Sequence, residues 1–167
     1  MNARLSEEVD RSVKSEMPQC DDWTSVVITE KLLRIVAIVS GHIFLGPDLC
    51  RREEYIDASI NFTVNVFTAI RALKRWPRIV RPIIQYFIPE LRRLRAHREK
   101  SKQFLIPIIQ ERKVLMREGK DLPDDLLQWM LNKSDDTSHY DDAEMAFMQL
   151  LLSMAAIHTT SMTTTNM

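Results

Sequence analysis

The stretch from Ala143 to Ile157 constrains the fold most, because it predicts a helix that is apolar on nearly every side. Asp141 followed by Glu144 has the spacing of a capping box at the start of this helix. A helix that is hydrophobic all round needs partners on all sides. The stretch contains Gln149 and is shorter than the ~18–20 apolar residues of a membrane span. We therefore expect a buried helix at the centre of a large helical structure.

The remainder of the chain predicts an all-α fold, since it contains only three glycines and long apolar-periodic runs between turn signals. Pro77 and Pro89 bracket an apolar stretch that is expected to be a loop with a short helical piece, and Pro107 is expected to kink a long helix. A polar loop is expected over 133–140. The predicted helices cover 5–17, Trp23 to Gly41 or Gly46, 53–76, 89 to about 119, 121–132 and 143–157.

Charge is unevenly distributed although the formal net charge is zero. Residues 71–117 contain 14 basic and 3 acidic side chains, whereas 118–167 contain 2 basic and 9 acidic. The basic segment is compatible with a solvated helix face or with a nucleic-acid binder or adaptor, but aromatic residues are sparse in it and no binding module appears, so no nucleic-acid partner is predicted. A third interpretation combines the cations with the apolar stretch Ile79 to Ile88, which suits contact with an anionic membrane surface.

The hexapeptide Ala155-Ala156-Ile157-His158-Thr159-Thr160 resembles the central-helix motif of the cytochrome P450 family, A/G-G-x-D/E-T-T/S. On that match Ala155 and Ala156 are small cofactor-facing residues, and Thr159 is the residue whose hydroxyl helps to deliver protons during oxygen activation. His158 stands where most members carry an acid, and it is a possible assistant. The alternative is that Thr159 and Thr160 only begin a polar helix end and that His158 is a satisfied boundary histidine.

The resemblance covers nearly all of residues 1–167 and is closest to the fungal ent-kaurene-oxidase-like group. It implies an incomplete cytochrome P450 fold from the fourth to the ninth lettered helix. The matching segments are Asp22-Trp23-Thr24, Lys31-Leu32-Leu33, Ile35 to Gly41, Gly46 to Arg51 with Glu53-Glu54, Trp76-Pro77 and Pro89 to Arg95.

The family resemblance implies a haem (heme) monooxygenase that oxidises a lipophilic secondary metabolite, with a terpenoid as the expected class. It also implies an NADPH-cytochrome reductase as electron donor and a location on the cytosolic face of the endoplasmic reticulum membrane. No signal peptide or transmembrane segment is predicted in these residues.

Two family motifs do not occur in this sequence. The haem-ligating motif F-x-x-G-x-R/H-x-C-x-G is absent. Cys50 is a poor match to its cysteine, because Asp48 stands where the motif has a basic residue and Arg52 where it has the final glycine. Cys50 also lies before the central helix, whereas the motif follows that helix in the family. Glu90-Leu91-Arg92-Arg93 copies the E-x-x-R pair in the wrong place. We therefore expect a fragment that is inactive in isolation, and the alternative is a truncated helical remnant or interaction protein. No set of histidine, cysteine and acidic residues has metal-ligand spacing, so no metal ligand is predicted.

Overall fold

A computed structural model describes residues 2–137 and 141–165, and within these residues the regular structure consists of helices without strands. The prediction of an all-α fold is confirmed. The helices are α1 (Asn2–Glu16), α2 (Ile28–Leu45), α3 (Glu53–Lys74), α4 (Arg81–Ile84), α5 (Pro89–Arg117), α6 (Leu126–Thr137) and α7 (Asp142–Thr165).

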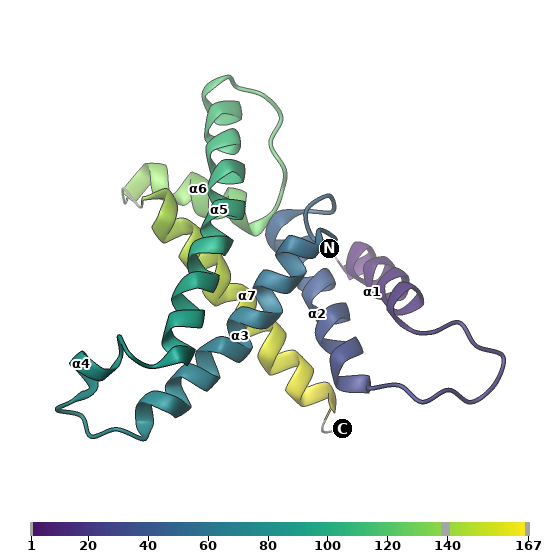
Figure 1. Ribbon diagram of the computed structural model, residues 1–167. Coiled ribbons are helices and arrows are strands. Elements are labelled where there is room, and N and C mark those ends of the chain that lie inside the picture. The colour runs from purple at the N-terminus through teal and green to yellow at the C-terminus, as the bar shows by residue number, and fades with distance from the viewer. Residues whose placement is uncertain (1, 138–140, 166–167) are drawn as a thin grey trace.

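Helix α7 lies at the centre, where it crosses α2, α3 and α5 (Figure 1). Its buried residues follow a four-residue spacing along one side, which places them in the shared core with α2, α3, α5 and α6. They are Met145, Ala146, Gln149, Leu150, Ser153, Ile157 and Ser161. The hydroxyls of Tyr55 on α3 and Ser153 on α7 lie 3.2 Å apart, so the buried phenol has a hydrogen-bond partner.

The close approach of α2 to α3 depends on Gly41. A Cβ atom at this position would lie 2.4 Å from Cε1 of Tyr55 and 3.0 Å from the Cβ of Cys50. Both of these neighbours are buried, so neither can move into solvent. Gly46, which follows α2, has a φ of 89° and turns the chain toward α3 in a conformation that favours glycine.

A buried ion pair joins α5 to the start of α6. The guanidinium of Arg112 donates to both carboxylate oxygens of Asp125, at 2.5 and 2.7 Å, and also to the carbonyl oxygen of Leu45 at 3.1 Å. The same carboxylate accepts from the backbone N–H of Gln128 at 2.9 Å and so caps α6. The ion pair therefore connects three elements: Arg112 bonds to the end of α2, and Asp125 joins α5 to α6.

The helix starts differ from those predicted in two places. Helix α2 begins at Ile28 and not near Trp23, whose side chain is fully exposed on the segment that precedes the helix. That segment has no core to cover it, so the predicted helix start there is wrong. Helix α6 begins at Leu126, where Asp125 caps it, and not at Asp121.

Helix α6 also continues to Thr137, so the predicted polar loop over 133–140 is wrong in its first part, and its last three residues, 138–140, lie outside the described residues. Helix α7 runs to Thr165, eight residues past the predicted end at Ile157, whereas the other sequence boundaries agree more closely. Pro89 is the first residue of α5, Pro107 lies inside that helix, and α4 is the short helical piece between Pro77 and Pro89.

Helix α1 is attached to the remaining helices by ion pairs. Arg34 on α2 donates to Glu16 at 2.8 Å and to Glu53 at 2.7 Å, and these two hydrogen bonds raise the pKa of its guanidinium. Arg51 donates to the buried carboxylate of Glu8 at 2.5 Å. Polar contacts therefore contribute to holding α1 on the surface of α2.

Candidate functional site

The motif residues lie inside the second half of α7, which continues as a helix to Thr165. Ala155 and Thr159 are exposed, and because α-helical residues four apart share a face, they lie on one open side of α7. The same side carries further exposed apolar residues, Met148, Leu152 and Met162. Hereafter these five residues are called the open face of α7. Within the described residues, no other helix covers this face of α7, although a helix that is apolar all round needs partners on all sides.

Thr159 is bonded to its own helix. Its hydroxyl donates to the carbonyl oxygen of Ala155 at 2.6 Å. Such back-bonding satisfies the hydroxyl proton and leaves the oxygen free to accept a hydrogen bond from the open side. The structure thus brings two of the sequence-predicted site residues, Ala155 and Thr159, into direct contact.

The other two predicted site residues, Ala156 and His158, lie at the two edges of the open face, between it and the buried side of α7. Successive residues are about 100° apart around an α-helix, so Ala156 and His158 flank the open face on opposite sides. Both are half-buried. The His158 ring packs against Phe67 of α3, with ring centroids 4.5 Å apart. The structure therefore directs His158 toward α3 and away from the open face on which Thr159 lies.

The open face of α7 suits one side of a flat apolar cofactor such as haem. The short side chain of Ala155 leaves space over the middle of this face. Leu152 and Met162 supply larger apolar side chains before and after it along the helix. Neither cysteine of the chain is placed to be the axial ligand. Cys50 is completely buried beside α2, and this burial raises the pKa of its thiol to about 11, while Cys20 is exposed on the segment before α2. These residues would thus supply one wall of a haem site without its iron ligand.

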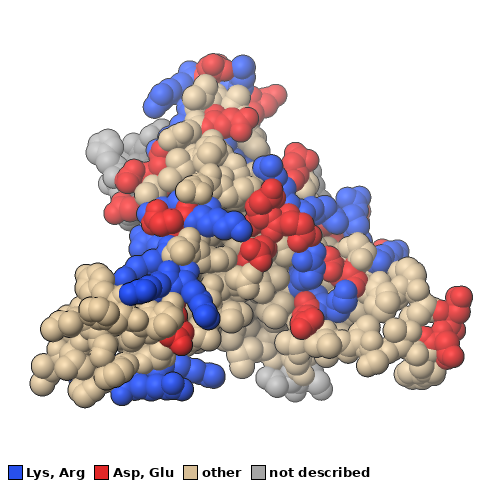
Figure 2. Space-filling view, in the orientation of Figure 1, with Lys and Arg blue, Asp and Glu red and all other residues tan. Residues whose placement is uncertain are grey.

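A second surface feature is the segment around α4, which stands apart from the helical core (Figure 1). Ile79, Ile83, Tyr86 and Phe87 are strongly exposed here. Figure 2 shows a mostly tan lobe at the lower left, with Lys and Arg side chains beside it. Hereafter residues 79–88 are called the α4 lobe.

Arginines of α5 hold the base of the α4 lobe. The Arg92 Nε donates to the carbonyl oxygen of Tyr86 at 3.1 Å, and Arg95 donates to that of Gln85 at 3.3 Å. The guanidinium of Arg95 also lies over the Tyr86 ring, 4.8 Å from its centroid. Ile88 is only 7% exposed, so it belongs to the core and not to the exposed apolar surface of the lobe.

Helix α7 is, by length and composition, the one described helix that could cross a membrane. Core helices of soluble domains meet the same criterion, and α7 packs on three neighbouring helices along its buried side. We therefore treat it as the core helix that carries the candidate site.

The fold and the site define an all-helical protein whose central helix presents small, apolar and hydroxyl side chains on one face. The sequence model of the family described as Cytochrome P450 matches residues 1–167. The chain therefore belongs to the cytochrome P450 family, whose cofactor is haem.

Several fungal relatives are similar over almost the whole chain. The protein described as cytochrome P450 monooxygenase ORF5 from Penicillium roqueforti is 40% identical, with 97% of this chain and 30% of the relative covered. Cytochrome P450 monooxygenase braC from Annulohypoxylon truncatum is 37% identical over 93% of this chain and 32% of its own length. Cytochrome P450 monooxygenase ATR3 from Stachybotrys chlorohalonatus is 37% identical over 97% of this chain and 34% of its own length. The chain thus spans about a third of the length of these relatives. No solved structure gave a significant match.

Two arrangements were not found from the sequence. The open face of α7 could not be distinguished from its buried side, because both sides are apolar. Glu8, His42 and Cys50 also converge in space, although their separation along the chain gives no ligand spacing. No local sequence signal could have identified either arrangement.

Proposed function

We propose that the whole protein is a haem-dependent monooxygenase that hydroxylates or otherwise oxidises a lipophilic secondary metabolite, with a terpenoid as the expected class. The observation that supports this proposal best is the open face of α7, where Ala155 and Thr159 lie among apolar side chains. An apolar face excludes water from a reacting substrate, and a single hydroxyl within it provides a defined position for a proton.

When bound, haem supplies the chemistry of dioxygen activation, with electrons from an NADPH-cytochrome reductase. The protein side chains would bind, orient and transfer protons. Ala155 and Ala156 have no side-chain atoms beyond Cβ, so a flat ring and a substrate can approach the helix closely. Leu152 and Met162 would keep the surroundings apolar.

Thr159 is the proton-delivery residue in this proposal. Its hydroxyl can turn from the carbonyl oxygen of Ala155 toward the open side, donate its proton to an acceptor there and take up a replacement proton from a water on the same side. His158, at the edge of the open face, would assist this proton transfer. Because its ring packs on Phe67, a water molecule would have to connect it to Thr159.

The test compares Thr159→Ala with Thr159→Ser in the full-length enzyme. We expect product formation to fall on the order of 10²-fold in the alanine variant and to recover in the serine variant, which retains the hydroxyl. Haem content should be the same in all three proteins. Equal product formation in the alanine variant and the wild type would refute the role of Thr159.

The encoding transcript distinguishes the enzyme from the alternative of an inactive helical remnant. A transcript that continues in frame beyond the Met167 codon into E-x-x-R and F-x-x-G-x-R-x-C-x-G supports the enzyme, whereas a stop codon supports the remnant. On either interpretation, the isolated chain, mixed with haemin and reduced under carbon monoxide, should give no thiolate-type Soret band, because Cys50 is buried and Cys20, on the segment between α1 and α2, is not part of the open face of α7.

We also propose that the α4 lobe contacts the cytosolic face of the endoplasmic reticulum membrane. Ile79, Ile83 and Phe87 are exposed apolar residues; Arg78 precedes them in the sequence, and Arg81 lies between Ile79 and Ile83. Apolar side chains with neighbouring cations suit insertion at the surface of an anionic bilayer. Burying each large apolar side chain contributes about 1.5–3 kcal/mol.

The membrane test uses vesicles that contain anionic lipid. Ile83→Asp with Phe87→Asp should reduce co-sedimentation strongly, whereas Val27→Asp with Ile28→Asp should leave it unchanged. The control positions are also exposed apolar residues, but they lie at the start of α2, away from the α4 lobe (Figure 1). Ile88 is avoided because its substitution would disturb the core. Equal binding of both double variants would exclude the lobe as the contact.

A further inference from the structure

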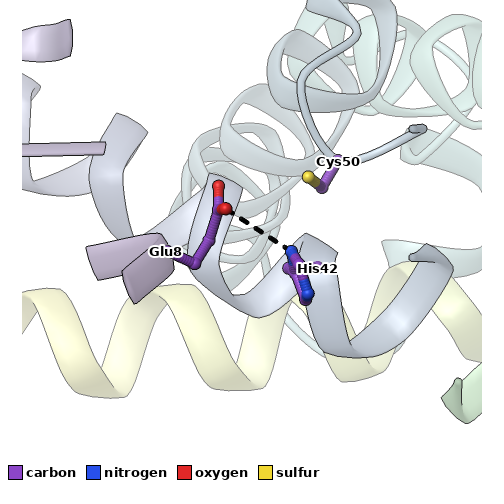
Figure 3. A group of neighbouring side chains, drawn as sticks. All are labelled: Glu8, His42 and Cys50. Carbon is purple, nitrogen blue, oxygen red and sulfur yellow. Dashed lines mark ion pairs between the residues drawn. The ribbon is translucent and has the colours of Figure 1, made fainter. Parts of the chain in front are cut away.

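Three potential metal ligands from different segments meet beside α1. Glu8 lies on α1, His42 on α2 and Cys50 in the turn that follows α2 (Figure 3). One ligand atom from each residue lies within 4.8 Å of the other two. Glu8 is only 5% exposed and Cys50 is completely buried, while His42 is half-buried. None of the three residues belongs to α7, so the cluster is separate from the candidate haem-facing site.

Each residue of the cluster retains an atom that can bind a metal. The Oε1 of Glu8 accepts from Arg51 at 2.5 Å, but Oε2 faces Nδ1 of His42 at 3.6 Å, which is too long for a good hydrogen bond. Nδ1 of His42 is buried without a hydrogen-bond partner. The Cys50 thiol donates weakly to the carbonyl oxygen of Pro47 at 3.2 Å.

We propose that Glu8, His42 and Cys50 bind a thiophilic divalent cation of the zinc type. Carboxylate oxygen, imidazole nitrogen and thiolate sulfur are the ligands of tetrahedral zinc, at about 2.0–2.3 Å. The mixed donor set, with sulfur and imidazole, favours zinc over calcium or magnesium, which take oxygen ligands. Ligand atoms around such an ion lie about 3.3–3.8 Å from one another. Oε2 of Glu8 and Nδ1 of His42 already lie 3.6 Å apart, and the pairs that are up to 4.8 Å apart must close by about 1 Å.

The residues around the cluster provide access for a cation and an orienting partner for the Glu8 carboxylate. A cavity of about 640 Å³ is lined by Glu8 and His42 but not by Cys50, so a cation would enter from the side of the carboxylate and the imidazole, where there is room for a water as the fourth ligand. Arg51 stays on Oε1 of Glu8 and orients the carboxylate, as partners of ligating groups commonly do. Thiolate and carboxylate carry two negative charges, so the cluster with Arg51 and a divalent cation carries one net positive charge. Binding replaces the thiol proton of Cys50, which is released to solvent.

The consequence would be a cross-link between α1 and α2. Helix α1 is otherwise held to its neighbours largely by ion pairs and polar contacts. A bound cation that prefers the folded chain stabilises it in proportion to the logarithm of its concentration over its dissociation constant. The site is therefore structural, and it would fix the position of α1.

The experiment is a titration of the purified chain with Co²⁺, a spectroscopic substitute for Zn²⁺. A near-ultraviolet thiolate-to-cobalt charge-transfer band should appear with one cation per chain and should be displaced by Zn²⁺. The band should persist in Cys20→Ser, which removes the exposed cysteine, and should be lost in Cys50→Ser. His42→Gln should weaken Co²⁺ binding by at least about tenfold.

Thermal unfolding gives an independent readout if Cys50→Ser does not fold. Zn²⁺ should raise the Tm of the wild type and of Cys20→Ser, and a chelator should reverse the shift. The shift should be absent in His42→Gln, in which the substituted side chain is half-buried. Absence of the cobalt band in the wild type, a band lost in Cys20→Ser, or an equal Zn²⁺ shift in wild type and His42→Gln would each overturn the proposal.

Discussion

Substitution of Asp125 by alanine should destabilise this chain more than any surface change. Asp125 and its partner Arg112 have side chains that are only 2% and 6% exposed. Removing the carboxylate leaves the guanidinium buried with a single remaining acceptor, the carbonyl oxygen of Leu45. Breaking one partner of a buried pair costs about 3–5 kcal/mol.

The same carboxylate caps α6 through the N–H of Gln128. Loss of a helix cap adds about 1 kcal/mol, so the expected total is about 4–6 kcal/mol. That is a large part of the ~5–15 kcal/mol by which ordinary domains are stable. Asp125→Asn should cost less, since asparagine retains the cap and one hydrogen bond to Arg112.

Urea unfolding followed by far-ultraviolet circular dichroism measures these free energies. The matched control is Asp10→Ala, which breaks the exposed ion pair between Asp10 and Lys14 and should change the stability by less than about 1 kcal/mol. Arg112→Met combined with Asp125→Ala should recover much of the loss, because no buried charge remains. The reasoning fails if Asp125→Ala costs no more than Asp10→Ala, since water would then have to reach the pair.

Two further predictions concern helix packing and pH. Gly41→Ala should lower the Tm, because the added Cβ would lie 2.4 Å from the buried Tyr55 ring. This clash should outweigh the helix preference of alanine over glycine, which is about 1 kcal/mol. An unchanged or higher Tm would contradict the close approach of α2 and α3. The hydrogen bond from Lys113 holds the pKa of Asp142 below its usual 3.8, so the stabilising contribution is present above that pH and is lost as the pH falls through the lowered value. Urea unfolding should therefore show an advantage of wild type over Lys113→Gln of at most about 1 kcal/mol at neutral pH, which shrinks below about pH 4; an advantage that stays constant down to lower pH would refute it.

The helices themselves could be predicted from the sequence, because local signals mark most of their ends. Pro77 and Pro89 bound the α4 segment, and Gly46 and Gly119 adopt positive φ angles of 89° and 63° after α2 and α5. The predicted start at Trp23 failed since an apolar residue signals burial only if another element covers it. The motif at Ala155 to Thr160, together with the matching segments along the rest of the chain, indicated the family without any knowledge of the fold.

Tertiary structure alone decided which side of α7 stays open. The helix is apolar all round, so its sequence has no periodicity that distinguishes Ala155 and Thr159 from the buried side. It also decided that His158 turns toward Phe67, and that Arg112 meets Asp125 in the core. Contacts of this kind join residues far apart in the chain, and their energies depend on burial, which no local sequence pattern specifies.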